Sequence, residues 1–439
     1  MSWRDAVRPV RMQRVGLVVP AEHTRDLLAR LDTAGVVELD PVQPEVELAV
    51  TAERQPDWSA RETEFRRRTA QAVAHGPVTA WLGWTPNAAL PDLTSELASI
   101  GGAVVPLPQP PGIQPPTLLR QQGRGQSFEL IVQTYTTVPY ADVDPSLVAG
   151  IVYVAMFGMM FGDVGHGLLL LIGAAIVRSG RFARLAKIRR AWPFLAGAGA
   201  MSVVFGFLYG EMFGPTGLVP VLWLSPIDAV TTLLLTAIGV GAVLLGGAYA
   251  LGIVNRFREG GWGFVLYART GIAGSLLFLA LGGVVAGIYF GIGGILLAAV
   301  LLAIAGLVLT FVGLLAVAGG GSAGVLQAVV ELFDVVVRLG SNVVSFARLA
   351  AFGLTHAALG AIVWLGATAL WGGGSPAGRV GAVLVLLIGT AVAFALEALV
   401  AGIQALRLEY YELFSRVFES DGRPFRPWRL PAEDLEVTP

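Results

Sequence analysis

Residues 270–330 read TGIAGSLLFLALGGVVAGIYFGIGGILLAAVLLAIAGLVLTFVGLLAVAGGGSAGVLQAVV and contain no charged side chain. A helix needs about 20 apolar residues to cross the hydrocarbon layer of a membrane. This stretch is therefore long enough for two spans, with a break near the glycines at 291–294. The whole chain is 55% hydrophobic and only 14% charged, which lies outside the range of soluble globular proteins. The composition predicts a polytopic membrane protein.

Six further crossings are expected in total, four before this stretch and two after it. Residues 145–178 are too long for one span, and the glycine-rich sequence GDVGHG at 162–167 interrupts them, so we expect two short helices joined by a turn. The remaining spans are expected at the following uncharged stretches: 191–212, 227–254, 341–371 and 380–409. The sequence thus predicts a mostly α membrane protein with eight transmembrane helices, which form an ion-translocating domain over residues 144–420.

The distribution of basic residues predicts the orientation of these spans. Loop 178–190 carries six Lys and Arg residues and no acid, and loop 255–269 carries three Arg residues. Short cytoplasmic loops collect such cations, so both loops are expected in the cytoplasm. Eight crossings then leave both termini in the cytoplasm, including a tail at residues 421–439.

The N-terminal region, residues 1–143, differs from the rest because charges are frequent in it. Short β-type runs at 14–20 and 35–40 flank a helical stretch at 21–34, and a second passage of mixed β and α character follows at 78–107. A charged segment near 57–75 is expected to form a short coiled coil. This pattern predicts a soluble α+β domain.

Several functions are disfavoured by composition. The net charge is −1 and the chain has no cysteine, so we expect no nucleic-acid partner, disulfide, thiolate metal site or thiol catalysis. No G-x-x-x-x-G-K-[ST] phosphate loop occurs. We expect no cofactor, no metal site and no catalytic residue in this chain.

Two arginines, Arg348 and Arg407, lie deep inside the last two hydrophobic segments. A charge at the bilayer centre costs from about 3 to more than 10 kcal/mol, so such residues usually face protein or water and mark an ion path. The stretch from Arg348 to Trp371 is nearly as long as the stretch from Val380 to Arg407. On antiparallel helices, this similarity puts both arginines at similar depth, within about 6 Å.

Other ionisable residues extend this polar line. His356 and Glu397 lie at nearly equal separations from the same two reference points, which predicts a second layer nearer the outside. Asp334 precedes Arg348 by close to a whole number of helical turns, on the same helix face and about 21 Å toward the cytoplasm. The order indicates two polar access routes separated by an arginine barrier. The alternatives are that His356 is a packing residue and that Arg407 extends to the cytoplasmic interface.

The glycine-rich turn carries two more ionisable residues, Asp163 and His166. They are interspersed with three glycines that permit close backbone approach or positive φ, namely Gly162, Gly165 and Gly167. A turn-capping role is the simplest interpretation of the two polar side chains.

The chain resembles subunit a, also called subunit I, of the V-type and A-type rotary ATPases. The resemblance runs from the soluble region to the C-terminus, and its most specific motif is SNVVSFARLAAFGLTH at 341–356. Further motifs are GWTP at 83–86, PPT at 115–117, VPY at 138–140, FGMMFGDVGHG at 157–167, FGFLYG at 205–210, LEA at 396–398 and QALRLEY at 404–410.

The resemblance implies roles for individual residues. It implies that Arg348 is the required arginine beside a carboxylate of the rotor ring and that Arg407 is the second arginine. It also implies that Glu397 and His356 line the outward half-channel. Asp334 would be the acid of the cytoplasmic half-channel, where the family usually carries glutamate. One departure is a shortened soluble arm, in which only the segment near 57–75 corresponds to a long coiled coil.

The resemblance also implies partners and a location. They are a rotor ring of c/K-type proteolipid subunits, peripheral-stalk subunits of the E/G type, the lipid bilayer of a prokaryotic plasma membrane and, indirectly, a central stalk and catalytic head. The expected function is conduction of H⁺ or Na⁺ coupled to ATP synthesis or hydrolysis, with the chemistry performed by other subunits. A secondary transporter and a non-conducting assembly paralogue remain as alternatives.

Overall fold

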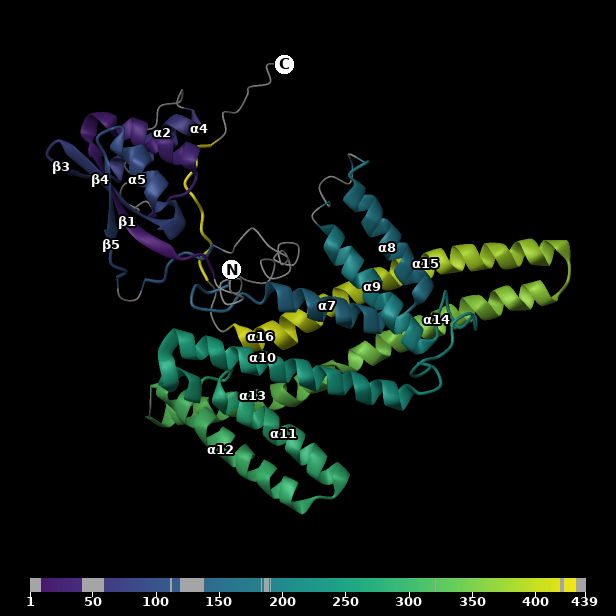
Figure 1. Cartoon of the computed structure of the whole chain (residues 1–439). Coiled ribbons are helices and arrows are strands. Elements are labelled where there is room, and N and C mark those ends of the chain that lie inside the picture. Colours follow the sequence, from purple (N-terminus) through teal and green to yellow (C-terminus); the bar gives the residue numbers. More distant parts are fainter. Residues whose placement is uncertain are drawn as a thin grey trace. The chain divides into compact units, whose positions relative to one another are not determined.

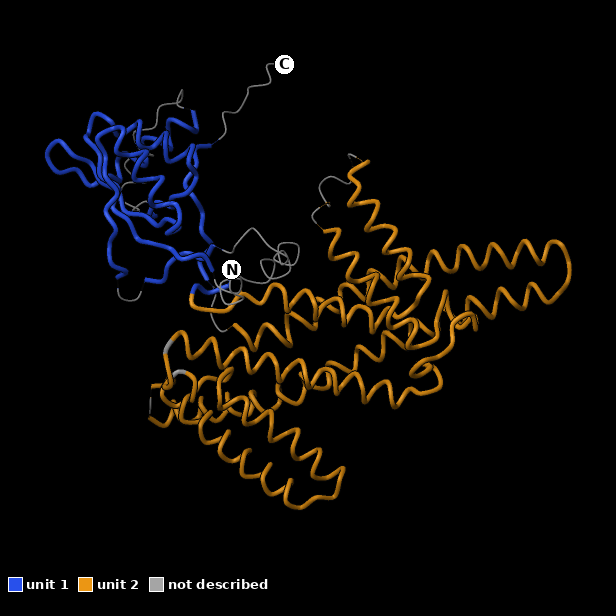
Figure 2. The backbone as a smooth tube through the Cα atoms, in the orientation of Figure 1, with its two compact units in different colours: residues 1–121, 137–140, 421–439 blue, residues 122–136, 141–420 orange. Residues whose placement is uncertain are grey.

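The computed structural model describes residues 9–41, 59–110, 113–118, 138–182, 184, 189, 191–319, 321–418 and 422–431. Six of the thirteen residues of loop 178–190, on which the predicted orientation depends, lie outside these residues. The chain divides into two compact units. Unit 1 comprises residues 1–121, 137–140 and 421–439, and unit 2 comprises residues 122–136 and 141–420 (Figure 2).

Unit 1 is built on an antiparallel sheet. Its strands are β1 (Met12–Pro20), β2 (Glu38–Leu39), β3 (Val73–His75), β4 (Val78–Pro86) and β5 (Ala103–Leu107). They are ordered β2-β4-β1-β5, with β3 paired to β4. The helices are α2 (Thr24–Ala34), α4 (Ala60–Ala70) and α5 (Leu90–Ala98). The sequence predicts this mixture of strands and helices, because apolar residues alternate along β1 and recur at helical spacing in α2.

The core of unit 1 includes residues from both ends of the chain. Leu17 of β1, Leu31 of α2 and Phe65 of α4 are buried together with Trp428. Trp428 lies in the segment 422–431. The backbone of this segment pairs with Thr117, whose N–H donates to the oxygen of Arg423 and whose oxygen accepts from the N–H of Phe425. The residues expected to form a C-terminal tail therefore include a structural part of the N-terminal domain.

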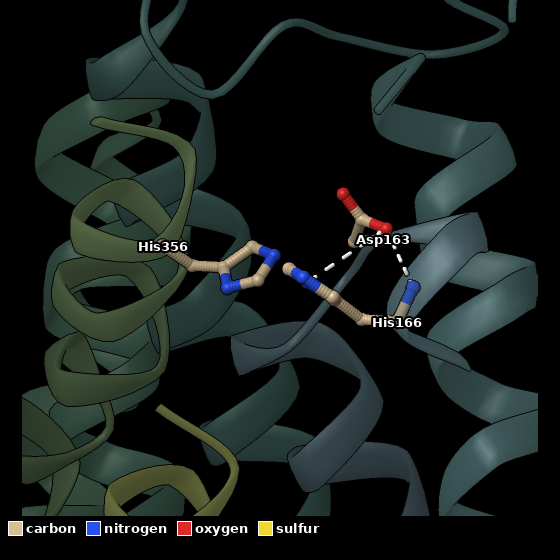
Figure 3. Close-up of side chains that lie close together, drawn as sticks. All are labelled: Asp163, His166 and His356. Atoms are coloured by element: carbon tan, nitrogen blue, oxygen red, sulfur yellow. Dashed lines mark hydrogen bonds and ion pairs between the residues drawn. The ribbon is translucent and has the colours of Figure 1, made fainter. Parts of the chain in front are cut away.

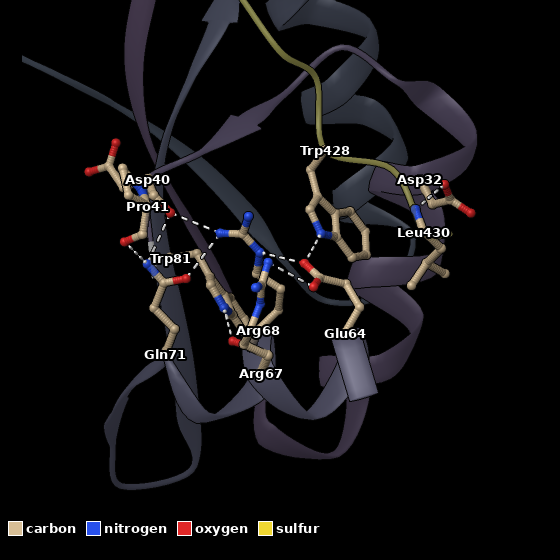
Figure 4. A network of polar contacts seen from close by, with 10 residues as sticks. All are labelled: Asp32, Asp40, Pro41, Glu64, Arg67, Arg68, Gln71, Trp81, Trp428 and Leu430. Atoms are coloured by element: carbon tan, nitrogen blue, oxygen red, sulfur yellow. Dashed lines mark hydrogen bonds and ion pairs between the residues drawn. The ribbon is translucent and has the colours of Figure 1, made fainter. Parts of the chain in front are cut away.

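A polar network surrounds this tryptophan (Figure 4). Glu64 of α4 accepts hydrogen bonds from Trp428 Nε1 at 3.2 Å and from Arg68 Nε at 3.1 Å. Arg68 Nη1 in turn donates to the backbone oxygen of Asp40 at 2.8 Å, and Trp81 Nε1 donates to the backbone oxygen of Arg68 at 2.9 Å. Burial lowers the pKa of the Arg68 guanidinium, and Glu64 partly offsets this effect.

Unit 2 is helical (Figure 1). Its long elements are α7 (Ser146–Met160), α8 (Val164–Ser179), α9 (Trp192–Tyr209), α10 (Val230–Tyr267, kinked at Gly261), α11 (Ile272–Phe290), α12 (Gly293–Ala318), α13 (Gly321–Ser345), α14 (Ala347–Gly372) and α15 (Pro376–Leu408). A π-helical turn at Glu409–Phe414 and the short α16 (Ser415–Val417) follow α15. The break between α11 and α12 lies at Gly291, where the sequence predicts it.

Six helical stretches in the described part of the chain are long and apolar enough to cross a membrane. They are 192–209, 230–259, 261–290, 293–318, 321–372 and 376–417. The helices α7 and α8 are apolar but have only 15 and 16 residues. The chain is therefore a multi-pass membrane protein by composition and helix length, and the count of eight spans stays a prediction.

One local difference concerns the segment before Arg348. The sequence analysis treats Asp334 and Arg348 as residues of one continuous helix, whereas the structure has two helices, α13 and α14, that meet at Phe346. Phe346 is fully buried and lies against Gly241 of α10, where a Cβ atom would overlap its ring. The helical stretch 321–372 nevertheless runs through both helices, and Phe346 has right-handed helical dihedrals, so the shared face of Asp334 and Arg348 stays a prediction.

Candidate functional site

The turn between α7 and α8 is closely packed against α9. An added Cβ at Gly167 would lie 2.8 Å from the backbone oxygen of Gly199, and one at Gly206 would lie 2.3 Å from the backbone nitrogen of Val164. Such distances leave no room for a side chain. Gly162 and Gly165 face aromatic rings at similarly short distances. The glycines of this motif therefore allow helix backbones and rings to approach one another closely.

Asp163 holds this turn in place. Its side chain is fully buried and accepts hydrogen bonds from the backbone nitrogen of His166 at 2.8 Å and from that of Gly214 at 3.0 Å. The first bond caps the N-terminus of α8, where backbone N–H groups lack partners within the helix. The second ties the loop after α9 to the same carboxylate.

His356 of α14 and Glu397 of α15 are in contact. The two helices run antiparallel, side by side (Figure 1), and His356 Nδ1 is hydrogen-bonded to Glu397 Oε2. The side chains are 5% and 11% exposed. The spacing argument from the sequence placed these two residues at one depth, and the structure brings them together. Glu397 Oε1 has no hydrogen-bond partner among the described residues.

His166 joins this pair from the other side (Figure 3). Its imidazole centroid lies 5.4 Å from that of His356, in an edge-on arrangement. Side-chain atoms of Asp163, His166 and His356 all lie within 4.8 Å of one another. The turn between α7 and α8 and the last two long helices therefore contribute to one buried polar cluster.

Glu211 lies close to the same cluster and was not among the candidates from the sequence. It follows α9, is 4% exposed and interacts electrostatically with His356, Asp163 and Glu397. Its backbone oxygen also accepts a hydrogen bond from Val164 at 2.9 Å. A signal was available, because an acid directly after an apolar helix in a membrane protein is costly unless it is paired or hydrated.

Arg348 lines a groove between α10 and the junction of α13 with α14. The groove has a volume of about 640 Å³ and is lined largely by small and aliphatic residues, among them Val230, Leu233 and Leu354. Arg348 Nη1 is buried and has no hydrogen-bond partner among the described residues. The charges that act most strongly on this guanidinium are those of Arg407, which repels it, and Glu412, which attracts it.

Arg407 and Asp334 occupy more open positions. Arg407 is exposed near the end of α15, close enough to Arg348 to repel its charge. Asp334 is about half exposed and forms an ion pair with Arg338 at 2.7 Å, one turn along α13. Of the sequence candidates, the structure groups His356 with Glu397, Asp163 and His166, and Arg348 with Arg407. It leaves Asp334 paired locally.

Glu412 is a further residue that sequence reasoning did not include. The Asn342 amide of α13 is oriented so that its nitrogen donates to Glu412 at 2.9 Å and its oxygen accepts from Arg416 at 2.6 Å. These bonds connect α13 to the π-helical turn and to α16. Glu412 thus belongs to this network, and its charge attracts the guanidinium of Arg348.

Comparison with known proteins shows which proteins this chain resembles. Residues 78–216 match the family model described as the V-type ATPase 116kDa subunit family. The A-type ATP synthase subunit I of Archaeoglobus fulgidus is 28% identical over 404 residues, covering 79% of this chain and 58% of that protein. The corresponding subunit of Pyrococcus horikoshii is 27% identical, covering 81% of this chain and 54% of that protein.

A bacterial protein matches a shorter part of the chain. The V-type ATP synthase subunit I 2 of Treponema pallidum is 33% identical over 141 residues, covering 30% of this chain and 31% of that protein. The chain spans about half the length of the archaeal relatives that it matches. The chain is therefore similar over most of its length to subunit I of A-type ATP synthases, and over a shorter part to subunit I of a V-type ATP synthase and to the V-type ATPase 116kDa subunit family.

Proposed function

We propose that this chain is the membrane-embedded stator subunit of a rotary ATPase and conducts H⁺, with Na⁺ as the alternative ion. In this proposal the ion moves through two half-channels at the interface with a rotor ring of c/K-type subunits. The observation that carries it is Arg348, a permanently charged residue with an unpaired, buried guanidinium nitrogen that lines an otherwise largely apolar groove.

The groove offers a reason for such an unpaired charge. A carboxylate on the ring must be neutral while it faces lipid, because an isolated buried charge is prohibitively costly. Beside Arg348 the same carboxylate can ionise, since a nearby opposite charge favours the charged form. The arginine therefore acts as the exchange point at which a ring carboxylate releases one ion and takes up the next, and its charge repels cations that would leak past it.

The buried cluster at His356 supports an access route on one side of Arg348. His356 follows Arg348 on α14 by a little over two helical turns, which corresponds to about 12 Å along the helix. Together with Glu397, Asp163, His166 and Glu211 it gathers buried polar groups among the apolar helices of unit 2. Such groups are typical of proton relays. We assign this cluster to the outward half-channel, and Asp334 to the cytoplasmic one.

The surface of α15 supports a partner in the membrane. The stretch 376–417 is the least buried of the six candidate spans, with 6% of its most apolar window inside the protein. Exposed aliphatic side chains recur along it, among them Leu387, Leu399 and Ile403. We propose that the rotor ring packs against α14 and α15. Unit 1 would contact peripheral-stalk subunits of the E/G type, with the termini in the cytoplasm.

The decisive experiment is Arg348→Ala in the intact complex, with ATP-driven ion pumping measured in inverted membrane vesicles. We expect pumping to fall to background while the complex still assembles. The matched control is Arg379→Ala, because Arg379 is an exposed arginine at the start of α15, far from the groove, whose guanidinium lies over the ring of Trp371 at 5.9 Å. Its substitution should leave pumping unchanged.

Three outcomes would contradict the proposal. Pumping at the wild-type rate in Arg348→Ala membranes would remove Arg348 from the ion path. Substrate uptake by the purified chain in liposomes, without ring subunits, would instead identify a secondary transporter. Assembly of a wild-type complex that never pumps would identify a non-conducting paralogue. Measurement of the dicyclohexylcarbodiimide-sensitive flux with and without Na⁺ then identifies the ion.

A further inference from the structure

Three buried side chains with metal-binding chemistry converge at the turn between α7 and α8. Asp163, His166 and His356 are 0%, 3% and 5% exposed, and one ligand atom from each lies within 4.8 Å of the other two. Figure 3 shows the two imidazoles pointing toward each other, with the carboxylate of Asp163 beside them. Two imidazole nitrogens and one carboxylate oxygen form a ligand set that suits zinc and related divalent metals.

Glu397 prepares His356 for such a role. Because His356 Nδ1 is hydrogen-bonded to Glu397, the neutral ring carries its proton on Nδ1 and keeps the lone pair of Nε2 available. A carboxylate that holds the far nitrogen of a ligating histidine is the usual outer partner in zinc sites, where it fixes the tautomer and the ring orientation. Glu397 is therefore a positioning residue for His356.

His166 is buried, and neither of its ring nitrogens has a hydrogen-bond partner among the described residues. The nearest carboxylate oxygen, Asp163 Oδ1, lies 3.8 Å from Nδ1. The rings of Phe161, Phe213 and Phe394 surround it, with centroids 5.4 to 5.5 Å away. Burying polar nitrogens among aromatic rings costs free energy unless a partner binds them.

The spacing is compatible with one small ion. Zinc binds nitrogen and oxygen ligands at about 2.0–2.2 Å, so ligand atoms around a tetrahedral ion lie about 3.4 Å apart. The cluster, at up to 4.8 Å, would have to contract by about 1.4 Å at most. The backbone bonds from His166 and Gly214 anchor Asp163, so rotation of the two imidazoles would make this adjustment. Three protein ligands leave one position open.

We propose that Asp163, His166 and His356 form a binding site for a divalent d-block cation of the zinc type. Imidazole ligands favour such ions over Mg²⁺ and Ca²⁺, which prefer oxygen. A consequence that rests on the proposed function is that an occupied site blocks the outward half-channel. Bound metal would occupy the lone pair of His356 Nε2, so this nitrogen could not accept a proton and no proton could pass through the ring to Glu397. Zn²⁺ would therefore slow ion flux.

The test exploits the small number of competing ligands. The chain has four histidines and no cysteine, and the other two histidines, His23 and His75, lie in unit 1 at positions open to solvent. We would purify the full-length His23→Gln/His75→Gln variant and titrate it with Co²⁺, a coloured substitute for Zn²⁺. We expect one Co²⁺ per chain with the strong visible bands of tetrahedral coordination, displaced by Zn²⁺ and not by Mg²⁺.

X-ray absorption at the zinc edge tests the same site without altering it. Since only His166 and His356 remain in this variant, two imidazole ligands on Zn²⁺ would identify both residues. No bound metal, or a spectrum with fewer than two imidazoles, would overturn the proposed site. His166→Gln should abolish stoichiometric binding in the same background, and tight binding that survives this substitution would also overturn it.

Glu397→Gln separates positioning from ligation. Loss of an outer partner typically weakens metal affinity 10- to 100-fold, so this variant should bind Co²⁺ more weakly by that factor and keep the tetrahedral spectrum. Unchanged affinity would remove Glu397 from the site.

The predicted block of ion flux is tested by adding Zn²⁺ to vesicles that contain a pumping complex. If Zn²⁺ binds but does not slow a pumping complex, the proposed block is wrong and the metal site stands. If the complex never pumps, the proposed function is contradicted, and the binding experiments alone decide whether the metal site exists.

Discussion

The two units of this protein differ in the buried polar groups and in the exposed apolar side chains that they carry. In unit 1 the buried residues are predominantly apolar, as in the cluster around Leu17, Leu31 and Trp81, and ion pairs such as Arg25–Glu62 and Arg66–Glu62 lie toward the surface. In unit 2 the buried side chains include acids and histidines, while Val243, Tyr289 and Val317 are 76%, 78% and 87% exposed. This difference indicates that the two units are surrounded by different environments. Unit 1 has the pattern of a domain in water, and unit 2 that of a protein surrounded by hydrocarbon.

This contrast predicts that tryptophans contribute differently in the two units. Trp428 is 5% exposed, packs edge-on against Phe65 with centroids 6.4 Å apart, and donates to Glu64. We expect Trp428→Ala to destabilise unit 1 by about 3–5 kcal/mol, the usual cost of removing a buried aromatic side chain. Amide hydrogen exchange, resolved to peptides from β1 and β4, measures this change as a lower free energy of opening.

The matched control is Trp262→Ala in α10. Trp262 is 67% exposed, so its loss in detergent should change the opening free energy of its own helix by less than about 0.5 kcal/mol. A large effect at Trp262 would break the contrast, because it would mean that an exposed apolar side chain of unit 2 stabilises the folded chain. An unchanged β1 in Trp428→Ala would remove the C-terminal segment from the core of unit 1.

Much of this division could be predicted from sequence, because it depends on local pattern. Long uncharged stretches predict α9 to α12, α14 and α15, and alternation of apolar residues predicts β1 and β4. Depth counting from the loop between α14 and α15 was also enough to match His356 with Glu397. That argument works because, in two antiparallel helices joined by a short loop, residues at equal sequence distances from the loop lie at similar depth in the membrane.

Other features could not be predicted because they depend on contacts between distant segments. His166 and His356 are separated by most of the membrane region of the chain, so no short ligand spacing marks their cluster. Trp428 belongs to a core formed by the N-terminal strands and helices, and a terminal segment carries no local sign of this. Phe346, between α13 and α14, packs against Gly241 of α10, which leaves room for the phenylalanine ring. Helical periodicity within residues 321–372 cannot reveal it.

Glycine provides a second way to sharpen the comparison, within unit 2 itself. A methyl group at Gly206 would lie 2.3 Å from the backbone nitrogen of Val164, whereas one at Gly239 would have no heavy atom within 4 Å. We expect Gly206→Ala to cost at least about 1–3 kcal/mol through overpacking, because a backbone contact cannot move aside. The measurement is thermal unfolding of the purified chain in detergent, followed by far-ultraviolet circular dichroism.

Gly239→Ala is the control for this prediction. In an exposed position within α10, alanine improves helix propensity by about 0.5–1 kcal/mol, so the unfolding temperature should stay constant or rise. The opposite signs distinguish packing from propensity. If both substitutions lowered the unfolding temperature equally, the close approach of α8 and α9 would not be a constraint on this fold.

The smallest expected effect concerns Glu38, a buried carboxylate in unit 1 that departs from the pattern of that unit. It is 8% exposed and accepts from the backbone nitrogen of Arg426 at 2.7 Å and from Arg423 at 3.2 Å. Burial raises the pKa of Glu38 above its usual value of 4.5, against the opposing influence of these donors. The folded protein therefore binds this proton more tightly than the unfolded chain does.

The sign of the pH dependence follows from that difference in proton binding. Below about pH 4.5 the group is protonated in both states, and the stabilisation of the neutral form is fully present. As the pH rises from there through the raised pKa, stability falls by at most about 1.4 kcal/mol per pH unit and then becomes constant. Glu38→Gln should remove this slope, which is measured as the opening free energy of β1 amides, corrected for intrinsic exchange rates. A wild-type stability that instead rises through this window, relative to Glu38→Gln, would mean that the contacts with Arg423 and Arg426 outweigh burial, so that unit 1 tolerates a buried charge as unit 2 does.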